Sequence, residues 1–560
     1  MNLRVILFAA TAAAGLGGFA QAGEAPAPDP TEVFHGERLF LETRFAQRFH
    51  DFVVRGGDIN EPLDKGDPKL EKTYRFFGLP PYQIPFAPGP FEGSSYNCRT
   101  CHLVDEHVGQ QELGMRAYND FASRSPLPER DDGQSVTVRN SPVLVDSLAP
   151  RDPFLLHVDG EFASAREVII ATLTGRNLGW LPSEGDLAAR HACEVIRKDD
   201  GTGALAKEFG GFSYSEVFSG VSGSGEALPE QHRIAAELRI YVPESSCDEI
   251  LIGVANLIEH YLADLGFSKE ANTLSPYDRF LLINDLPTRP DAGESDEDYS
   301  DWLLAQINSL DESGELQFVE RNPATEDGGF RFHDQPYRFG EIELQGLRVF
   351  FNRKPAAERG AGNCGSCHAA PHFTDFGFHN IGVTQVEYEA IHGQGSFWKL
   401  LIPTVGQRNE QASIYLPATA ANPDRQGMFR RPASESEPMA TDLGAWSIFM
   451  NEDYPNAQEP LHRSFCQNGT GCKTADQALE QSIAAFKTPT LRDLGHSAPY
   501  MHNGQISDLH ASVAFYIAAS ASSRNGTIRN VDPELREVRI TPNDIQPLVS
   551  FLISLYEDYE

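Results

Sequence analysis

Apolar side chains recur at intervals of three and four residues in several separate segments of the chain, the spacing that places them on one face of an α-helix. The segments with this spacing are 33–52, 164–173, 250–265, 341–351, 478–486, 509–518 and 545–555. Ser164 stands at the start of the second segment, where its hydroxyl would cap the helix N-terminus. Alternating patterns typical of strands are few, so we predict a mainly α chain.

Segments rich in Gly, Pro and acidic residues separate these helices and predict long loops. They are the Pro-rich linker 25–30, the excursion 56–90, the acidic loop 287–299 and the turn-rich stretch 321–338. A length of 560 residues favours two or three domains. We place an N-terminal domain with insertions over residues 23–335 and a C-terminal domain over residues 336–560.

The first 22 residues have the pattern of an export signal. Arg4 supplies a positive start, residues 5–20 are apolar and small, and Ala20-Gln21-Ala22 matches an A-x-A cleavage site. An uncleaved anchor is the alternative, although the apolar run is short for a membrane span. We therefore expect a periplasmic protein whose mature chain has no membrane span.

The chain is strongly acidic, with a formal net charge of −34 at pH 7. This charge argues against nucleic acid and anionic membrane surfaces as partners. It is compatible with a basic electron-donor protein, while the solubility of a charge-rich surface is the simpler explanation.

Two pentapeptides, Cys98-Arg99-Thr100-Cys101-His102 and Cys364-Gly365-Ser366-Cys367-His368, both read C-x-x-C-H. Two thiols at this spacing can add to the two vinyl groups of one porphyrin, and the adjacent His can then bind the iron. The alternatives are a redox C-x-x-C, which does not need the His, and half a zinc site, which needs further Cys or His ligands. We predict two covalently bound haem c groups, each in its own cytochrome-like helical domain.

Four of the 8 cysteines remain outside these motifs. Cys466 and Cys472 flank a short Gly-containing loop that can close into a disulfide, which leaves Cys193 to pair with Cys247. An oxidising compartment permits both bridges, and free buried thiols are the alternative.

Further motifs accompany the C-x-x-C-H pair. They are R-N-S-P at 139–142, P-H-F-T-D at 371–375, F-H-N-I-G-V at 378–383, T-P-T-L-R at 488–492 and A-P-Y-M-H-N-G at 498–504. In this combination the chain resembles the superfamily of bacterial dihaem cytochrome c peroxidases and MauG, from about residue 34 to the end. The resemblance is looser between residues 180 and 331, which look like long insertions.

The resemblance implies different roles for the two haems. The N-terminal haem, held by Cys98, Cys101 and His102, would be the peroxide-reacting centre. The C-terminal haem, held by Cys364, Cys367 and His368, would transfer electrons.

The second axial ligand of the C-terminal haem separates the subclasses of the superfamily. It is a Met in the peroxidases and a Tyr in MauG-like members, and the matching residue here is Tyr516. A phenolate stabilises high oxidation states, whereas a thioether raises the reduction potential. Met501 is the rival ligand, and an ordinary core role is the alternative for Tyr516.

A calcium ion between the haems is also implied by the resemblance. Its ligands would be the Asn140 side chain and the backbone carbonyls of Ser497 and Pro499, because Ca²⁺ takes oxygen ligands of both kinds. The alternative for Asn140 is a turn cap.

The chain departs from the superfamily at three places. The usual F-W-D-G-R, whose Trp lies between the haems, is replaced by His157-Val158-Asp159-Gly160-Glu161, and Gly362 stands where MauG has another Trp. The distal residue of the peroxide-reacting haem has no clear match. Arg176 is a candidate for polarising peroxide and His107 for a distal ligand or base. The alternatives are an Arg176 that stacks on Trp180 or pairs with a propionate, and a merely solvated His107.

The function implied is that of an exported dihaem c-type cytochrome oxidoreductase, a peroxidase that reduces hydrogen peroxide with electrons from a protein donor. Two alternatives stay open. One is a dihaem oxygenase acting on an apolar substrate, and the other is an electron-transfer cytochrome without a substrate.

Overall fold

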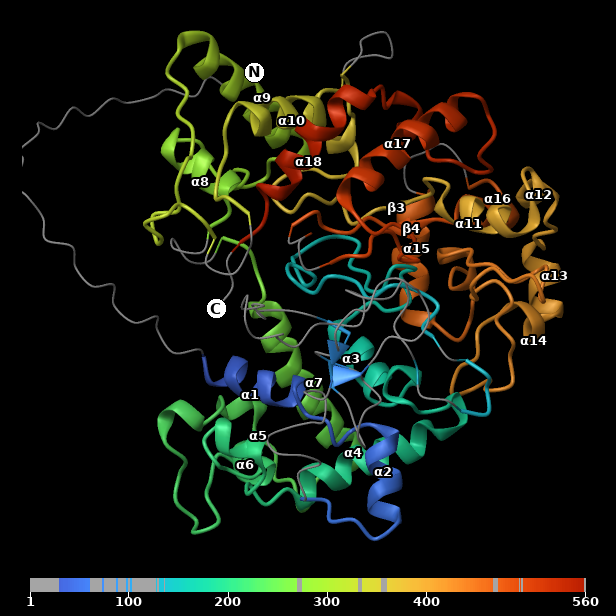
Figure 1. Cartoon of the computed structure of the whole chain (residues 1–560). Coiled ribbons are helices and arrows are strands. Elements are labelled where there is room, and N and C mark those ends of the chain that lie inside the picture. The colour runs from blue at the N-terminus through green and yellow to red at the C-terminus, as the bar shows by residue number, and fades with distance from the viewer. Residues whose placement is uncertain are drawn as a thin grey trace, which may run out of the picture.

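The computed structural model of the chain (Figure 1) describes residues 30–60, 73–74, 87–88, 97–98, 101–102, 127, 130–134, 136–268, 274–330, 335–353, 360–466, 472–492, 494 and 497–557. The expected signal segment and His107 lie outside these residues. None of the described helices combines the length and the apolar character needed to cross a membrane.

Short helices dominate the structure, as the periodicity predicts. Those of the first half are α1 (Thr31–Phe40), α2 (Gln47–Val54), α3 (Ala165–Leu173), α4 (Gly185–Lys198), α5 (Ala204–Glu208), α6 (Tyr214–Ser219), α7 (Cys247–Asp264), α8 (Pro276–Ile283) and α9 (Asp296–Ser313). Those of the second half are α10 (Glu341–Phe351), α11 (Val383–His392), α12 (Ser396–Lys399), α13 (Val405–Glu410), α14 (Ala412–Tyr415), α15 (Pro455–Cys466), α16 (Ala475–Gln481), α17 (Leu509–Arg524) and α18 (Ile545–Ile553). The strands pair antiparallel, β1 (Thr73–Tyr74) with β2 (Ala87–Pro88) and β3 (Phe378–His379) with β4 (Phe486–Lys487).

The first hydrophobic core gathers around the crossing of α1 and α7, in the lower, blue and green part of Figure 1. Gly36 makes this close crossing possible, because a Cβ atom there would lie 2.1 Å from the Leu257 carbonyl oxygen. The predicted disulfide Cys193–Cys247 is present and joins α4 to α7. This core also contacts Cys98 of the first C-x-x-C-H motif.

The second core repeats this arrangement with α10 and α18, at the top of Figure 1. Gly346 of α10 meets α18, and a Cβ atom there would lie 2.0 Å from the Pro547 carbonyl oxygen. Cys364 of the second motif contacts this core. Each motif therefore adjoins a core in which two helices cross closely at a glycine. This agrees with the predicted mainly α fold of two cytochrome-like units.

Residues before the expected boundary at 335/336 also belong to the second core. Side chains of α8 and α9, among them Phe280 and Ile307, lie in the same cluster as α10 and α18. The domain boundary itself stays a prediction.

A third cluster lies at the right of Figure 1, where α11–α14 and α16 gather. Its buried centre includes Trp446 and Phe429. The second predicted disulfide, Cys466–Cys472, is present at the end of α15.

Most of the sequence-predicted helices are found, with differences at their ends. The Ser164 hydroxyl accepts the Glu167 N–H at 3.3 Å and caps α3 as expected. The segment 33–52 divides into α1 and α2, and α17 continues six residues past the predicted end at 518. The acidic loop 287–299 ends early, because α9 starts at Asp296 with its N-terminus capped by Ser295.

Candidate functional site

Both C-x-x-C-H motifs form the same tight turn. In the first, the N–H groups of Cys101 and His102 donate to the Cys98 carbonyl at 3.1 and 3.0 Å. In the second, the N–H groups of Cys367 and His368 donate to the Cys364 carbonyl at 3.2 and 2.8 Å. The turn brings both thiols and the imidazole of each motif into one small region.

The two motif histidines are held by the same kind of hydrogen bond. The Nδ1 atom of His102 lies 2.9 Å from the Pro142 carbonyl, and that of His368 lies 2.9 Å from the Phe373 carbonyl. Such a bond fixes the ring as the tautomer that carries its proton on Nδ1, so the Nε2 lone pair can bind a metal. Burial lowers the pKa of His102 to about 4 and also lowers that of His368, which keeps both rings neutral.

The motif cysteines differ from those of the two alternative sites. None of the four is part of a disulfide, and burial raises the pKa of Cys98 and of Cys364 to about 12. A redox C-x-x-C pair instead activates one thiol by lowering its pKa. The described residues include one metal-like cluster with a motif cysteine, formed by Cys367, Asp375 and His379. Both nitrogens of His379 already face carboxylates, so a zinc site is not favoured.

Tyr516 lies on α17, next to the second motif. Burial raises the pKa of its phenol, and the neighbouring Cys364 and Cys367 thiols add to this effect. The structure thus brings Tyr516 into the surroundings of the motif, as the proposed ligand role requires. Met501 occupies a turn before α17 with a positive φ of 73°.

Two of the three predicted calcium ligands, Asn140 and Pro499, contact each other although they are far apart in the chain. The Asn140 N–H donates to the His502 carbonyl at 2.7 Å, and the Asn140 side-chain amide contacts the Pro499 carbonyl oxygen. The Asn140 Oδ1 atom is buried without a hydrogen-bond partner. An orphaned oxygen beside a backbone carbonyl suits a hard cation. Ser497, the third predicted ligand, lies two residues before Pro499.

Arg176 is engaged by a carboxylate. Its Nε and Nη2 atoms lie 2.6 and 3.0 Å from the two oxygens of Asp132, and Nη2 also donates to the Gln134 carbonyl at 3.0 Å. Trp180 is fully buried and donates its indole N–H to the Phe45 carbonyl. Any catalytic part played by Arg176 would therefore involve the Arg–Asp pair.

The divergent segment 157–161 is part of a buried network of charges. Arg139 contacts Asp159 at 2.6 Å and Asp442 at 2.6 Å. Arg430 contacts Asp159 at 3.1 Å and Glu161 at 2.5 Å. Sequence reasoning missed Arg430 and Asp442, because nothing local to either residue links it to a segment so distant in the chain.

The segment is also bound through its backbone to the second half of the chain. The Val158 carbonyl accepts the Lys487 N–H at 2.7 Å, which ties the segment to β4. Phe486, on the same strand, stacks on His502 with ring centroids 3.6 Å apart. These aromatic rings lie close to Arg139, whose guanidinium is 5.7 Å from the Phe486 centroid.

Gly362 is required by the packing of the second motif. Its N–H donates to the Val349 carbonyl at 2.8 Å, and an added Cβ atom would lie 2.4 Å from the same oxygen. A Trp at this position would displace the end of α10.

Comparison with known proteins gives partial matches. No family model matches the chain. Over 139 residues it is 30% identical to the cytochrome-c peroxidase IdrP1 of Denitromonas iodatirespirans, covering 22% of this chain and 36% of that protein. Over 84 residues it is 34% identical to the methylamine utilization protein MauG of Methylorubrum extorquens, covering 15% of this chain and 22% of that protein. These matches span about a third or less of the relatives' length.

A comparison of structures gives matches over most of the chain. The diheme peroxidase BthA from Burkholderia thailandensis E264 is 16% identical, with a TM-score of 0.42, and the match covers 95% of this chain and 88% of that one. A MauG-like protein associated with microbial copper homeostasis is 14% identical, with a TM-score of 0.41, covering 94% of this chain and 90% of that one.

Proposed function

We propose that this chain, which matches parts of a cytochrome-c peroxidase and of MauG, is an exported dihaem oxidoreductase that reduces hydrogen peroxide with electrons from a protein donor. The observation that carries the proposal is the repeated C-x-x-C-H turn, in which each His is fixed through Nδ1 and keeps Nε2 for a metal. When bound, haem c supplies one-electron redox chemistry and a site for peroxide.

The residues of each turn have defined parts in this proposal. Cys98 and Cys101 would hold the N-terminal haem covalently, and His102 would bind its iron. The Pro142 carbonyl fixes the ring orientation of His102 and increases its basicity as a ligand. Cys364, Cys367 and His368 do the same for the C-terminal haem, with the Phe373 carbonyl as the orienting group.

Tyr516 is proposed as the second axial ligand of the C-terminal haem. Its position beside Cys364 and Cys367 supports this role. Since burial disfavours the phenolate, Tyr516 stays protonated until a metal replaces its proton. A phenolate ligand would make this haem a weaker acceptor of electrons from an ordinary cytochrome c than a Met-ligated one.

The N-terminal haem is proposed to supply the peroxide site. Arg176, held by Asp132, is the proposed polarising group, and its guanidinium would donate to a developing negative charge. His107 stays a prediction from the sequence. A calcium ion held by Asn140, Ser497 and Pro499 is proposed at the junction of the halves, on the evidence of the orphaned Asn140 oxygen.

The exported protein should carry two haems and react with peroxide faster than it turns over cytochrome c. Denatured intact mass should exceed that of the polypeptide by two haems, and one or none would contradict the haem assignment. Stopped-flow mixing with peroxide should give a fast spectral change, while steady-state oxidation of a small basic cytochrome c should be slow. Cytochrome c turnover as fast as the peroxide reaction would indicate an ordinary peroxidase.

Two further measurements separate the alternative functions. Oxygen-dependent cleavage of an apolar substrate would favour a dihaem oxygenase. A protein that carries two haems and does not react with peroxide or oxygen would be an electron-transfer cytochrome.

A further inference from the structure

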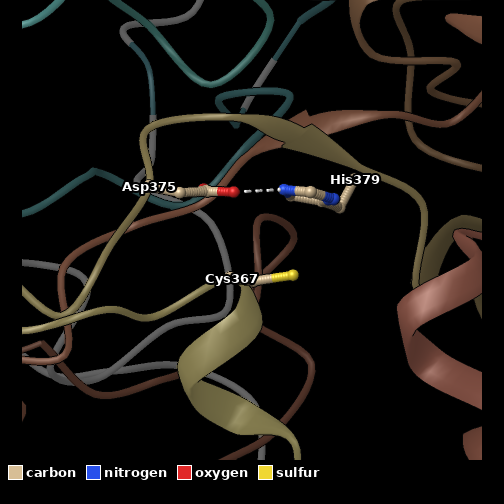
Figure 2. Close-up of side chains that lie close together, drawn as sticks. All are labelled: Cys367, Asp375 and His379. Carbon is tan, nitrogen blue, oxygen red and sulfur yellow. Dashed lines mark hydrogen bonds and ion pairs between the residues drawn. The ribbon is translucent and has the colours of Figure 1, made fainter. Parts of the chain in front are cut away.

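His379, on β3, lies between the carboxylates of Asp375 and Asp532. Figure 2 shows it with Asp375 and with Cys367 of the second C-x-x-C-H motif. Its Nε2 atom is 2.8 Å from Asp375 Oδ2, and its Nδ1 atom is 2.6 Å from Asp532 Oδ2. The Cys367 sulfur, one nitrogen of His379 and an oxygen of Asp375 all lie within 4.8 Å of one another. We call His379, Asp375 and Asp532 the histidine clamp.

The clamp geometry makes His379 a cation. A carboxylate can only accept, so an imidazole that bonds to a carboxylate at each nitrogen must donate from both and carry a positive charge. Burial alone would lower the pKa of His379, but the hydrogen bonds to the two carboxylates raise it well above its ordinary value. No lone pair remains on the ring for a metal, so the cluster is not a metal site.

The backbone holds the clamp in place from both sides. The Asp375 N–H donates to the Cys367 carbonyl at 2.8 Å, and the Asp532 N–H donates to the Asn380 carbonyl at 2.9 Å. Asn380 in turn donates its side-chain amide to the Arg529 and Asn530 carbonyls at 2.9 and 3.0 Å. The charged groups are therefore fixed relative to the Cys367 sulfur before any haem is attached.

We propose that the histidine clamp sets the reduction potential of the C-terminal haem, with His379 as the residue that raises it. The inference rests on the proposed function, because it requires the haem to be linked through Cys367. A fixed cation beside this linkage stabilises the reduced haem, which carries one positive charge fewer than the oxidised haem. The two carboxylates act in the opposite direction, and the imidazolium offsets one of them.

A purely structural clamp predicts a different response to mutation. If His379 and Asp532 only tie β3 to the segment after residue 530, removal of either should loosen the same contact and move the potential in the same direction. If their charges set the potential, His379→Gln should lower it and Asp532→Asn should raise it. The sign of the two shifts therefore separates the two roles.

Potentiometric titration of the purified dihaem protein, followed in the optical spectrum, measures both midpoints. We expect each variant to change the reduced-to-oxidised ratio of one haem about tenfold, which is about 59 mV for a one-electron couple. The other haem should keep its midpoint. His510→Gln, the same substitution at an exposed site on α17, should leave both midpoints unchanged.

The outcomes are distinguishable. Midpoint shifts of opposite sign at one haem support the proposed role of the histidine clamp. His379→Lys keeps the cation and should restore part of the potential that His379→Gln loses. Midpoint shifts of the same sign would overturn the proposed role of the clamp. Unchanged midpoints in variants whose intact mass includes two haems would overturn it as well. A wild-type mass without two haems would instead refute the proposed function, and the clamp with it.

Discussion

The crossing of α10 and α18 allows a sharp test of the packing that supports the second haem motif. An alanine Cβ at position 346 would lie 2.0 Å from the Pro547 carbonyl oxygen and 2.7 Å from the Phe551 Cβ. An ordinary contact between carbon and a carbonyl oxygen is about 3.3 Å, so the helices would have to separate by about 1.3 Å. Gly346→Ala should therefore destabilise the protein by roughly 1–3 kcal/mol, as overpacked cores do.

The loss of stability caused by the steric clash must exceed the gain in stability that alanine brings through its higher helix propensity. Alanine is better than glycine in a helix interior by about 1 kcal/mol, so propensity alone predicts a more stable variant. Gly406 of α13 supplies the matched control, because no atom lies within 4 Å of a Cβ placed there. Gly406→Ala should leave stability unchanged or increase it by about 0.5–1 kcal/mol.

Urea unfolding followed by far-UV circular dichroism measures both variants against the wild-type chain. The denaturant midpoint should fall for Gly346→Ala and stay or rise for Gly406→Ala. A midpoint for Gly346→Ala at or above that of wild type would refute the close crossing. A fall in both would show that glycine matters for a reason other than helix contact.

Three further predictions concern the ligands and the charges. Tyr516→Phe should abolish the low-spin EPR signal of one haem and leave the other, whereas the same effect from Met501→Leu would reject Tyr516 as ligand. Chelation of calcium should slow electron exchange between the haems in the wild-type protein. Asn140→Ala should show the same slow exchange without a chelator. Equal exchange rates of the wild-type protein with and without chelator would contradict a calcium site. Burial would raise the pKa of Glu42, but Arg44, 2.7 Å away, lowers it to about 2 from 4.5. Its stabilisation is thus present above pH 4.5 and lost as the pH falls towards 2, so the urea midpoint should drop more steeply over this range in wild type than in Glu42→Gln.

Local patterns in the sequence predicted much of the fold. The helices α3, α7, α10 and α18 follow apolar spacing closely, and the cysteine positions predicted both disulfides. The helix α9 was missed because its first turn is acidic and reads as an exposed loop, while Ser295 caps it and its apolar face joins a distant core.

The candidate site was predictable only where residue type and spacing alone carry the chemistry. The C-x-x-C-H motifs meet this condition, since their ligands are neighbours in the chain. The charged pairs elsewhere in the site do not: Asp532 is 153 residues from His379, and Asp442 is 303 residues from Arg139. Contacts at such separations depend on tertiary packing, which no local pattern encodes.

Two of the places where the chain departs from the superfamily that it resembles have a structural context. Glu161 reverses the charge of the usual Arg, and Arg430 supplies the missing cation from the other half of the chain. Val158 supplies no aromatic ring at the position where the superfamily that the chain resembles has a Trp. Gly362 cannot be exchanged for Trp without moving α10. Packing against α10 therefore accounts for Gly362, and in the proposed function electrons would have to pass by a route that uses neither Trp position.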